Sequence, residues 1–180
     1  SNPSPTPAQK QQIRNHFWQA LGDPAPEVRG FAGSVDFDEE YDRRLVKMLT
    51  TDPSDSVRQA IAIGMSQLTD GGAESCAGAE LVARHLPSFI VALKYPATQV
   101  FILDILGVRN SGDTYIPCCF SKSDKASVVR ALKSIRDSQV PKAPNSGYAA
   151  LAIGNIESCR TQTPTAQPMP DGSGTTPLRN

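Results

Sequence analysis

Residues 52–58, with the sequence DPSDSVR, decide the fold because they repeat an earlier stretch of the chain. Residues 23–29 read DPAPEVR and agree with them at four of seven positions, at an offset of 29 residues. Similarity at an offset of this size is typical of repeat architectures, in which each copy is one supersecondary unit. Two later blocks, 100–107 (VFILDILG) and 147–154 (GYAALAIG), align without gaps with residues 57–64 (VRQAIAIG). The chain is therefore predicted to hold four copies, starting at residues 28, 57, 100 and 147.

Each copy has the pattern of a helix that is preceded by a second helix. In the second copy, apolar residues recur on one face from Val57 to Leu68, after an N-cap signal at Asp52 and Pro53. Helical patterns also precede the copies at residues 9–21, 38–49, 79–95 and 123–136, the third of them interrupted at Pro87. No stretch alternates with period two, so the sequence predicts eight helices in four pairs and no sheet.

Composition narrows the class of protein. The 180 residues include 18 Lys and Arg, 18 Asp and Glu, and 39% hydrophobic residues, which suits one domain. The net charge of zero argues against a nucleic-acid binder, and no apolar run is long enough for a transmembrane segment. We expect residues 1–8 to be a flexible lead, residues 9–160 a helical repeat domain and residues 161–180 a Thr-, Pro- and Gly-rich tail. The lead also fits a spacer after a cleaved signal peptide or after a lipid anchor before residue 1.

Residues 45–60 (LVKMLTTDPSDSVRQA), closing with Leu68, resemble a HEAT-type repeat, and residues 17–35 resemble a second one. In that family the first helix ends in apolar residues, an Asp and often a Pro start the turn, and a Val-Arg pair opens the second helix. The resemblance is specific for residues 13–68 and loose for residues 79–158.

The resemblance implies an all-α fold: a short, right-handed HEAT-like α-solenoid of about four helix pairs. Members of the family mostly bind other proteins, while some relatives in bilin-attaching lyases handle a pigment and others bind DNA. The later copies depart from the pattern, because Phe101 and Tyr148 align with Arg58.

The Asp and Arg residues of the first two copies are expected to be structural. Asp23 and Asp52 would cap their helices, while Arg29 and Arg58 would reach the neighbouring turn. Together they would form a ladder that fixes the angle between repeats. A catalytic role for these residues is the alternative.

The four cysteines follow the second, third and fourth copies, as Cys76, Cys118, Cys119 and Cys159. In a helix-pair solenoid the connections that leave every second helix emerge on one edge, where loops could bring the Cα atoms within the roughly 7 Å that a disulfide needs. We expect two disulfides, from Cys76 to one member of the vicinal pair and from the other member to Cys159. A vicinal bond between Cys118 and Cys119 is the third possibility, because four cysteines permit three connectivities. Disulfides predict an oxidising compartment, such as the periplasm or the exterior; the alternative is four reduced thiols in a cytoplasmic protein.

Other chemistry is sparse in the sequence. His16 and His85 each stand alone in a predicted helix without a second ligand at metal spacing. The chain has no nucleophile elbow, phosphate-cradling glycine loop or Rossmann fingerprint. The sequence therefore predicts no catalytic residue, no metal site and no cofactor.

Two segments are candidate partner-binding surfaces. Residues 36–42 (DFDEEYD) hold five acids in seven positions, more than a helix start needs. The predicted acidic interface comprises Asp36, Phe37, Asp38, Glu39, Glu40 and Tyr41, and it would face a basic partner. The long insert 108–120 adds Tyr115 and Phe120, although its alternative role is to cover the core.

These patterns together favour a protein-binding module of an oxidising compartment. One concrete version is an exported bacterial inhibitor or immunity-type protein that blocks a partner enzyme with a basic surface. The competing class is a ligand-handling or lyase-like HEAT-repeat protein, and a deep apolar pocket with convergent polar groups would favour it. A structural component of the cell envelope is a third class.

Overall fold

The computed structural model describes residues 4–35, 38–68, 77–108, 116–137 and 145–159. The α-helices are α1 (Pro7–Ala20), α2 (Pro26–Gly33), α3 (Glu39–Thr51), α4 (Asp55–Leu68), α5 (Ala77–Arg84), α6 (Leu86–Ala92), α7 (Pro96–Leu103), α8 (Lys122–Arg136) and α9 (Ser146–Ser158). Two short turns complete the list, the π-helical η1 (Asp104–Val108) and the 3-10 turn η2 (Ile116–Cys119). The predicted all-α class is confirmed, and these ranges contain no strand.

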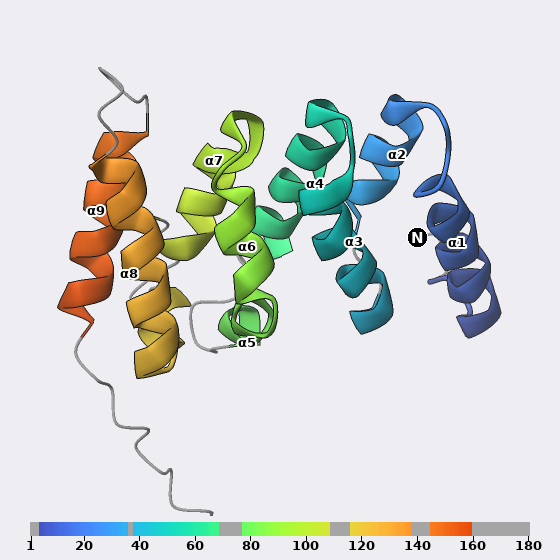
Figure 1. Ribbon diagram of the computed structural model, residues 1–180. Coiled ribbons are helices and arrows are strands. Elements are labelled where there is room, and N and C mark those ends of the chain that lie inside the picture. Colours follow the sequence, from blue (N-terminus) through green and yellow to red (C-terminus); the bar gives the residue numbers. More distant parts are fainter. Residues whose placement is uncertain (1–3, 36–37, 69–76, 109–115, 138–144, 160–180) are drawn as a thin grey trace, which may run out of the picture.

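The helices stand side by side in chain order, from α1 at one end to α9 at the other (Figure 1). They form two layers. In one layer α2, α4, α7 and α9 contact one another in succession, with η1 contributing to the last contact. The other layer holds α1, α3, α6 and α8, and each of these also contacts its sequence neighbour in the first layer. A continuous apolar core, from Leu21 to Ile156, fills the space between the layers.

Local signals explain where two of the helices begin. The predicted helix 79–95 is divided into α5 and α6, because Pro87 lies in the first turn of α6, where its missing N–H costs no helical hydrogen bond. The described residues therefore contain nine α-helices instead of eight. Helix α1 begins at Pro7, inside the predicted lead, since Thr6 and Gln9 form a capping box.

The repeated Asp residues have a different local role from the one predicted. Helices α2 and α4 begin three residues after Asp23 and Asp52, so neither residue is the N-cap of the helix that follows it. Instead, Asp23 accepts the N–H of Ala25 at 2.8 Å and Asp52 accepts the N–H of Ser54 at 2.9 Å. An Asp side chain that bonds the backbone two residues ahead closes a turn. Both residues therefore stabilise the turns that precede the helices.

The predicted alignment of the third copy is wrong by two residues. Arg29 donates to the carbonyl of Asp23, six residues back, and Arg58 does the same to the carbonyl of Asp52. In α7 the residue that makes this contact is Gln99, which donates to Leu93 O at 2.9 Å. Gln99 and not Phe101 thus occupies the position of Arg58.

Burial supports the corrected register. Thr98 then corresponds to Val57 and both are fully buried, whereas Val100, which the gap-free alignment placed there, is 38% exposed. In α9 the shift has the same size but the opposite direction, because Gly147 is exposed and Ala149, two residues later, is buried. The matching glycines at the ends of the aligned blocks misled the alignment.

Gly64 allows α2 and α4 to approach closely, and substituting it should destabilise the protein. A Cβ at Gly64 would lie 3.0 Å from Ser34 Cα and 3.2 Å from Gly33 O, both backbone atoms of the facing turn. We expect Gly64→Ala to lower the free energy of unfolding by about 1–3 kcal/mol, since the helices must separate. Urea unfolding followed by circular dichroism measures this change.

Gly154 provides the matched control for this substitution. A Cβ at Gly154 meets nothing within 4 Å, so Gly154→Ala should stabilise α9 by up to about 1 kcal/mol through helix propensity. Equal effects of the two substitutions would contradict the close approach of α2 and α4.

Candidate binding surface

The turns between the layers are joined by a ladder of side chains. Arg29 donates from Nε and Nη2 to both carboxylate oxygens of Asp52, at 2.9 and 3.0 Å. Arg58 donates to the Asp52 carbonyl and to Asp55, and its Cζ lies 4.4 Å from the centroid of the Tyr95 ring. The ladder therefore brings together Asp23, Arg29, Asp52 and Arg58.

The ladder continues into the second half of the chain through uncharged groups. The Tyr95 hydroxyl donates to Thr50 O at 3.1 Å, and Asn145 donates to Gln99 Oε1 at 2.7 Å. Sequence analysis missed Tyr95, Gln99 and Asn145, because none of them matches the Asp or Arg of the first copies. Through these contacts the three residues hold neighbouring helices in a fixed arrangement.

The pKa of Asp52 reflects its place in the ladder. Burial by itself would raise this pKa, but the hydrogen bonds from Arg29 and from the Ser54 N–H outweigh it, and the pKa is lowered from its ordinary 3.8. Asp52 is therefore ionised at neutral pH, and its negative charge is offset by Arg29.

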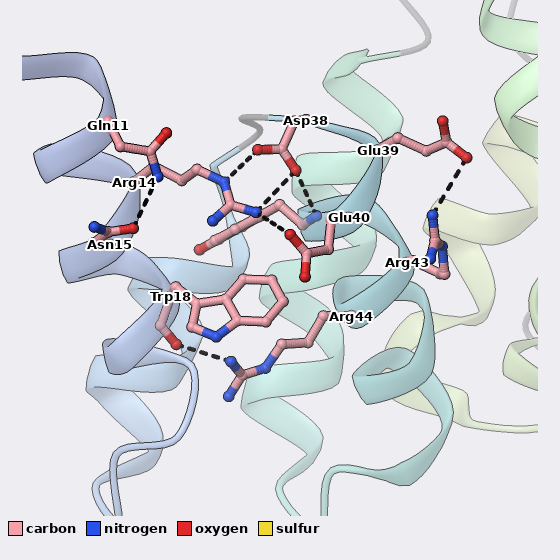
Figure 2. Close-up of polar contacts among 10 residues, drawn as sticks. Gln11, Arg14, Asn15, Trp18, Asp38, Glu39, Glu40, Arg43 and Arg44 are labelled. Carbon is pink, nitrogen blue, oxygen red and sulfur yellow. Dashed lines mark hydrogen bonds and ion pairs between the residues drawn. The ribbon is translucent and has the colours of Figure 1, made fainter. Parts of the chain in front are cut away.

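The acids at the start of α3 are paired with arginines (Figure 2). Asp38 is the N-cap of α3 and accepts the N–H of Tyr41 at 2.9 Å. Arg14 of α1 donates to both Asp38 and Glu40, the latter at 2.7 Å. Hydrogen bonds from Arg14, and then from the Tyr41 N–H, lower the pKa of Asp38. This part of the acidic segment thus joins α1 to α3.

Glu39 is paired as well. It lies 3.5 Å from an Arg43 nitrogen and 3.0 Å from an Arg84 nitrogen, so it links α3 to α5. Replacing Asp38, Glu39 and Glu40 with lysines would therefore remove a helix cap and three helix–helix contacts together with the charge. Loss of binding in such a variant would not distinguish an interface from a loss of structure.

Two residues of the predicted interface are core residues. Tyr41 is fully buried and its hydroxyl donates to Ala32 O at 2.9 Å. Burial raises its pKa to about 12. Phe120 is also buried, and a core side chain offers no surface to a partner. Asp36, Phe37 and Tyr115 lie outside the described residues.

A groove that was not predicted lies between α1 and α3. It has a volume of about 610 Å³ and is lined by Trp18, Leu21, Glu40, Arg43, Arg44, Lys47, Met48, Thr51, Asp52 and Pro53. Trp18 is partly exposed and stacks between two guanidinium groups, with Arg14 Cζ 5.1 Å and Arg44 Cζ 4.6 Å from its ring. Arg44 also donates to the backbone carbonyl of Trp18 at 3.0 Å, which holds its guanidinium group beside the Trp18 ring (Figure 2).

The charges of this groove do not cancel. Its two acids are paired with arginines outside the lining, Glu40 with Arg14 and Asp52 with Arg29. Lys47 is exposed and makes no ion pair with any described residue. Arg43 is paired with Glu39, whereas Arg44, like Lys47, makes no ion pair with a described residue. Arg44 and Lys47 therefore leave positive charge in a groove that Trp18, Leu21 and Met48 also line.

A second groove lies between α6 and α8, with a volume of about 780 Å³. Apolar side chains such as Leu86, Ile90 and Ala131 line it, and Arg84 and Arg130 add positive charge. It contains no aromatic side chain, so the α1–α3 groove offers the stronger anchor for a partner.

The disulfide chemistry agrees with the prediction where the structure describes it. Cys118 bonds to Cys159, with Cα atoms 5.2 Å apart and 41 residues between them in sequence. Cys119 is also disulfide-bonded, and no described cysteine is free. Cys76 lies outside the described residues, so its pairing stays a prediction.

Comparisons of the chain with protein-family models, with curated proteins and with solved structures found no match. None of the described helices is both long enough and apolar enough to cross a membrane. The described part also holds no group of three or more His, Cys, Asp or Glu residues placed to bind a metal ion. His16 is exposed on α1 and His85 lies between α5 and α6.

Proposed function

We propose that the chain is a protein-binding module built as a short HEAT-like α-solenoid, and that it binds an acidic segment of its partner in the groove between α1 and α3. The observation that carries the proposal is the Trp18 ring beside the guanidinium groups of Arg14 and Arg44, in a groove that the exposed Lys47 also lines. Tryptophan and arginine are the residues most often found at binding hot spots, because they combine a large apolar area with directed polar contacts. Lys47 adds a charge that no described acid neutralises.

The solenoid part of the proposal rests on the stacking of the pairs. The succession α2, α4, α7 and α9 in one layer, and the ladder between their preceding turns, are what a helix-pair repeat requires. The Cys118–Cys159 bond supports an oxidising compartment. If the partner is an enzyme, the chain would act as an exported inhibitor or immunity-type protein.

The chemistry of the groove favours acidic over basic partners. The acids once predicted to meet a basic enzyme are paired with Arg14, Arg43 and Arg84. Arg44 and Lys47 of the groove have no acidic partner among the described residues, and the same groove is lined by Trp18, Leu21 and Met48. A segment that alternates Asp or Glu with Leu or Phe would match both features.

Trp18 is the only tryptophan of the chain, so its fluorescence reports directly on the groove. We expect peptides that alternate acidic and apolar residues to shift the Trp18 emission, and peptides with lysine in place of the acids to leave it unchanged. Lys47→Glu should weaken peptide binding on the order of tenfold, since it reverses a charge at the rim.

Lys122→Glu is the matched control, because Lys122 is exposed in the first turn of α8, far from the groove, and has no ion pair among the described residues. It should bind the acidic peptides like the wild type. Preference for the basic peptides, or equal binding by both variants, would contradict the proposed site.

A further inference from the structure

The outer face of the first helix pair is apolar and exposed. Ile13 of α1 is 42% exposed, and Val28 and Phe31 of α2 are 40% and 68% exposed. Phe31 stacks on Phe17 of α1, with ring centroids 5.7 Å apart. Ile13 and Phe17 are four residues apart on one helix, and Val28 and Phe31 are three apart on the other, so the four side chains form one patch. We call these four residues the end patch.

The register of the repeats shows what kind of surface the end patch is. The contacts of Arg29 and Arg58 to the carbonyl six residues back place Val28 at the position of Val57, and Phe31 at that of Ala60. In α4 these positions receive the preceding pair, since a Cβ on Gly30 would lie 3.6 Å from Ala60 Cβ and 4.0 Å from Val57 Cα. The end patch is therefore a repeat-stacking surface with no described pair stacked on it.

The distribution of the other exposed hydrophobic residues favours a two-fold arrangement. Seven large hydrophobic side chains are exposed in the described ranges, and three belong to the end patch. The remaining four are spread over α6, α7 and α9, with only Tyr148 and Leu151 sharing a helix. In a closed assembly of two copies, the same patch of each chain meets across the two-fold axis, so one large patch per chain is buried completely. The net charge of zero places no overall repulsion between copies.

We propose that the occupant of the end patch is a second copy of this chain, and that two copies form a two-fold dimer in which their end patches pack against each other. This dimer leaves the α1–α3 groove accessible, because Trp18 points from α1 toward α3 (Figure 2) and not to the outer face. Self-association is thus independent of partner binding, and either proposal can fail without the other.

The test compares the mass in solution of the wild type and of two charged variants. Light scattering after size-exclusion chromatography at about 100 µM should give twice the chain mass of 19.3 kDa for the wild type, and dilution should lower it. Phe31→Glu should be a monomer, and Ile13→Glu, which changes the α1 side of the patch, should be a monomer too. Both side chains are exposed, so circular dichroism should show an unchanged helical fold.

Leu151→Glu is the matched control, since Leu151 is 52% exposed on α9, at the opposite end of the row. It should remain a dimer. A monomeric Leu151→Glu variant would indicate head-to-tail stacking and overturn the two-fold arrangement. A wild type that stays monomeric would overturn the proposal. Dimers of Phe31→Glu and Ile13→Glu would overturn it equally.

Discussion

Replacing both Cys118 and Cys159 with alanine is expected to lower the free energy of unfolding by about 4 kcal/mol. The bond closes a loop with a sequence separation of 41 residues, and the chain-entropy treatment gives about that value for a loop of this size. It ties η2 to the end of α9, the last helix of the row, which has neighbours among the described residues on one side only. The double substitution leaves no lone thiol beside Cys119, which is itself disulfide-bonded.

Urea unfolding of the oxidised wild type and of the double variant measures this loss. Hydrogen exchange should show faster opening of α9 than of α4, because the bond no longer holds the terminal pair. Reduction of the wild type should lower the free energy of unfolding more than the double substitution does, since reduction also breaks the disulfide of Cys119. Peptide mapping under non-reducing conditions should pair Cys119 with Cys76. A loss below about 1 kcal/mol in the double variant would contradict a stabilising role for the bond.

The all-α fold class could be predicted because the first two copies keep their chemistry. The Asp, Pro, Val and Arg shared by residues 23–29 and 52–58 mark both turns. The third copy could not be aligned correctly, since the hydrogen bond that Arg58 donates to the carbonyl six residues back is donated there by the amide of Gln99. A bond from a side chain to a carbonyl six residues back depends on reach and donor geometry, and a comparison of residue types does not detect it.

The candidate site was harder to predict than the fold. Tyr41 belongs to two patterns, the apolar stripe with Leu45 and Leu49 and the acidic run at the start of α3. The structure places it in the core with that stripe. The partner of Asp38 and Glu40 could not be found within α3, because it is Arg14, which belongs to α1. The lone tryptophan and the basic residues at 43, 44 and 47 were the available signal for the groove.

The second large effect is expected at the ladder, where Arg29→Met should lower the melting temperature by roughly 5–10 °C at pH 7. The Asp52 side chain is 5% exposed, and removing the cation leaves its buried carboxylate without its ion-pair partner. Arg136→Met is the matched control, because Arg136 also pairs with an Asp, but at the surface. It should shift the melting temperature by no more than about 2 °C.

The pH dependence of Arg29→Met separates loss of the ion pair from a general loss of packing. In the wild type the pKa of Asp52 is lowered, so its contribution to stability is present above about pH 3.8 and is lost as the pH falls through the folded-state value. Without Arg29, its hydrogen bonds and charge no longer lower the pKa of Asp52, so this pKa rises relative to the wild type and acidification costs the variant less stability than it costs the wild type. The difference in melting temperature between wild type and Arg29→Met should therefore narrow from pH 7 to pH 4. Adding Asp52→Asn to Arg29→Met should recover part of the loss in melting temperature at pH 7. If the difference in melting temperature between wild type and Arg29→Met stays constant with pH, loss of the ion pair is not the cause of that difference.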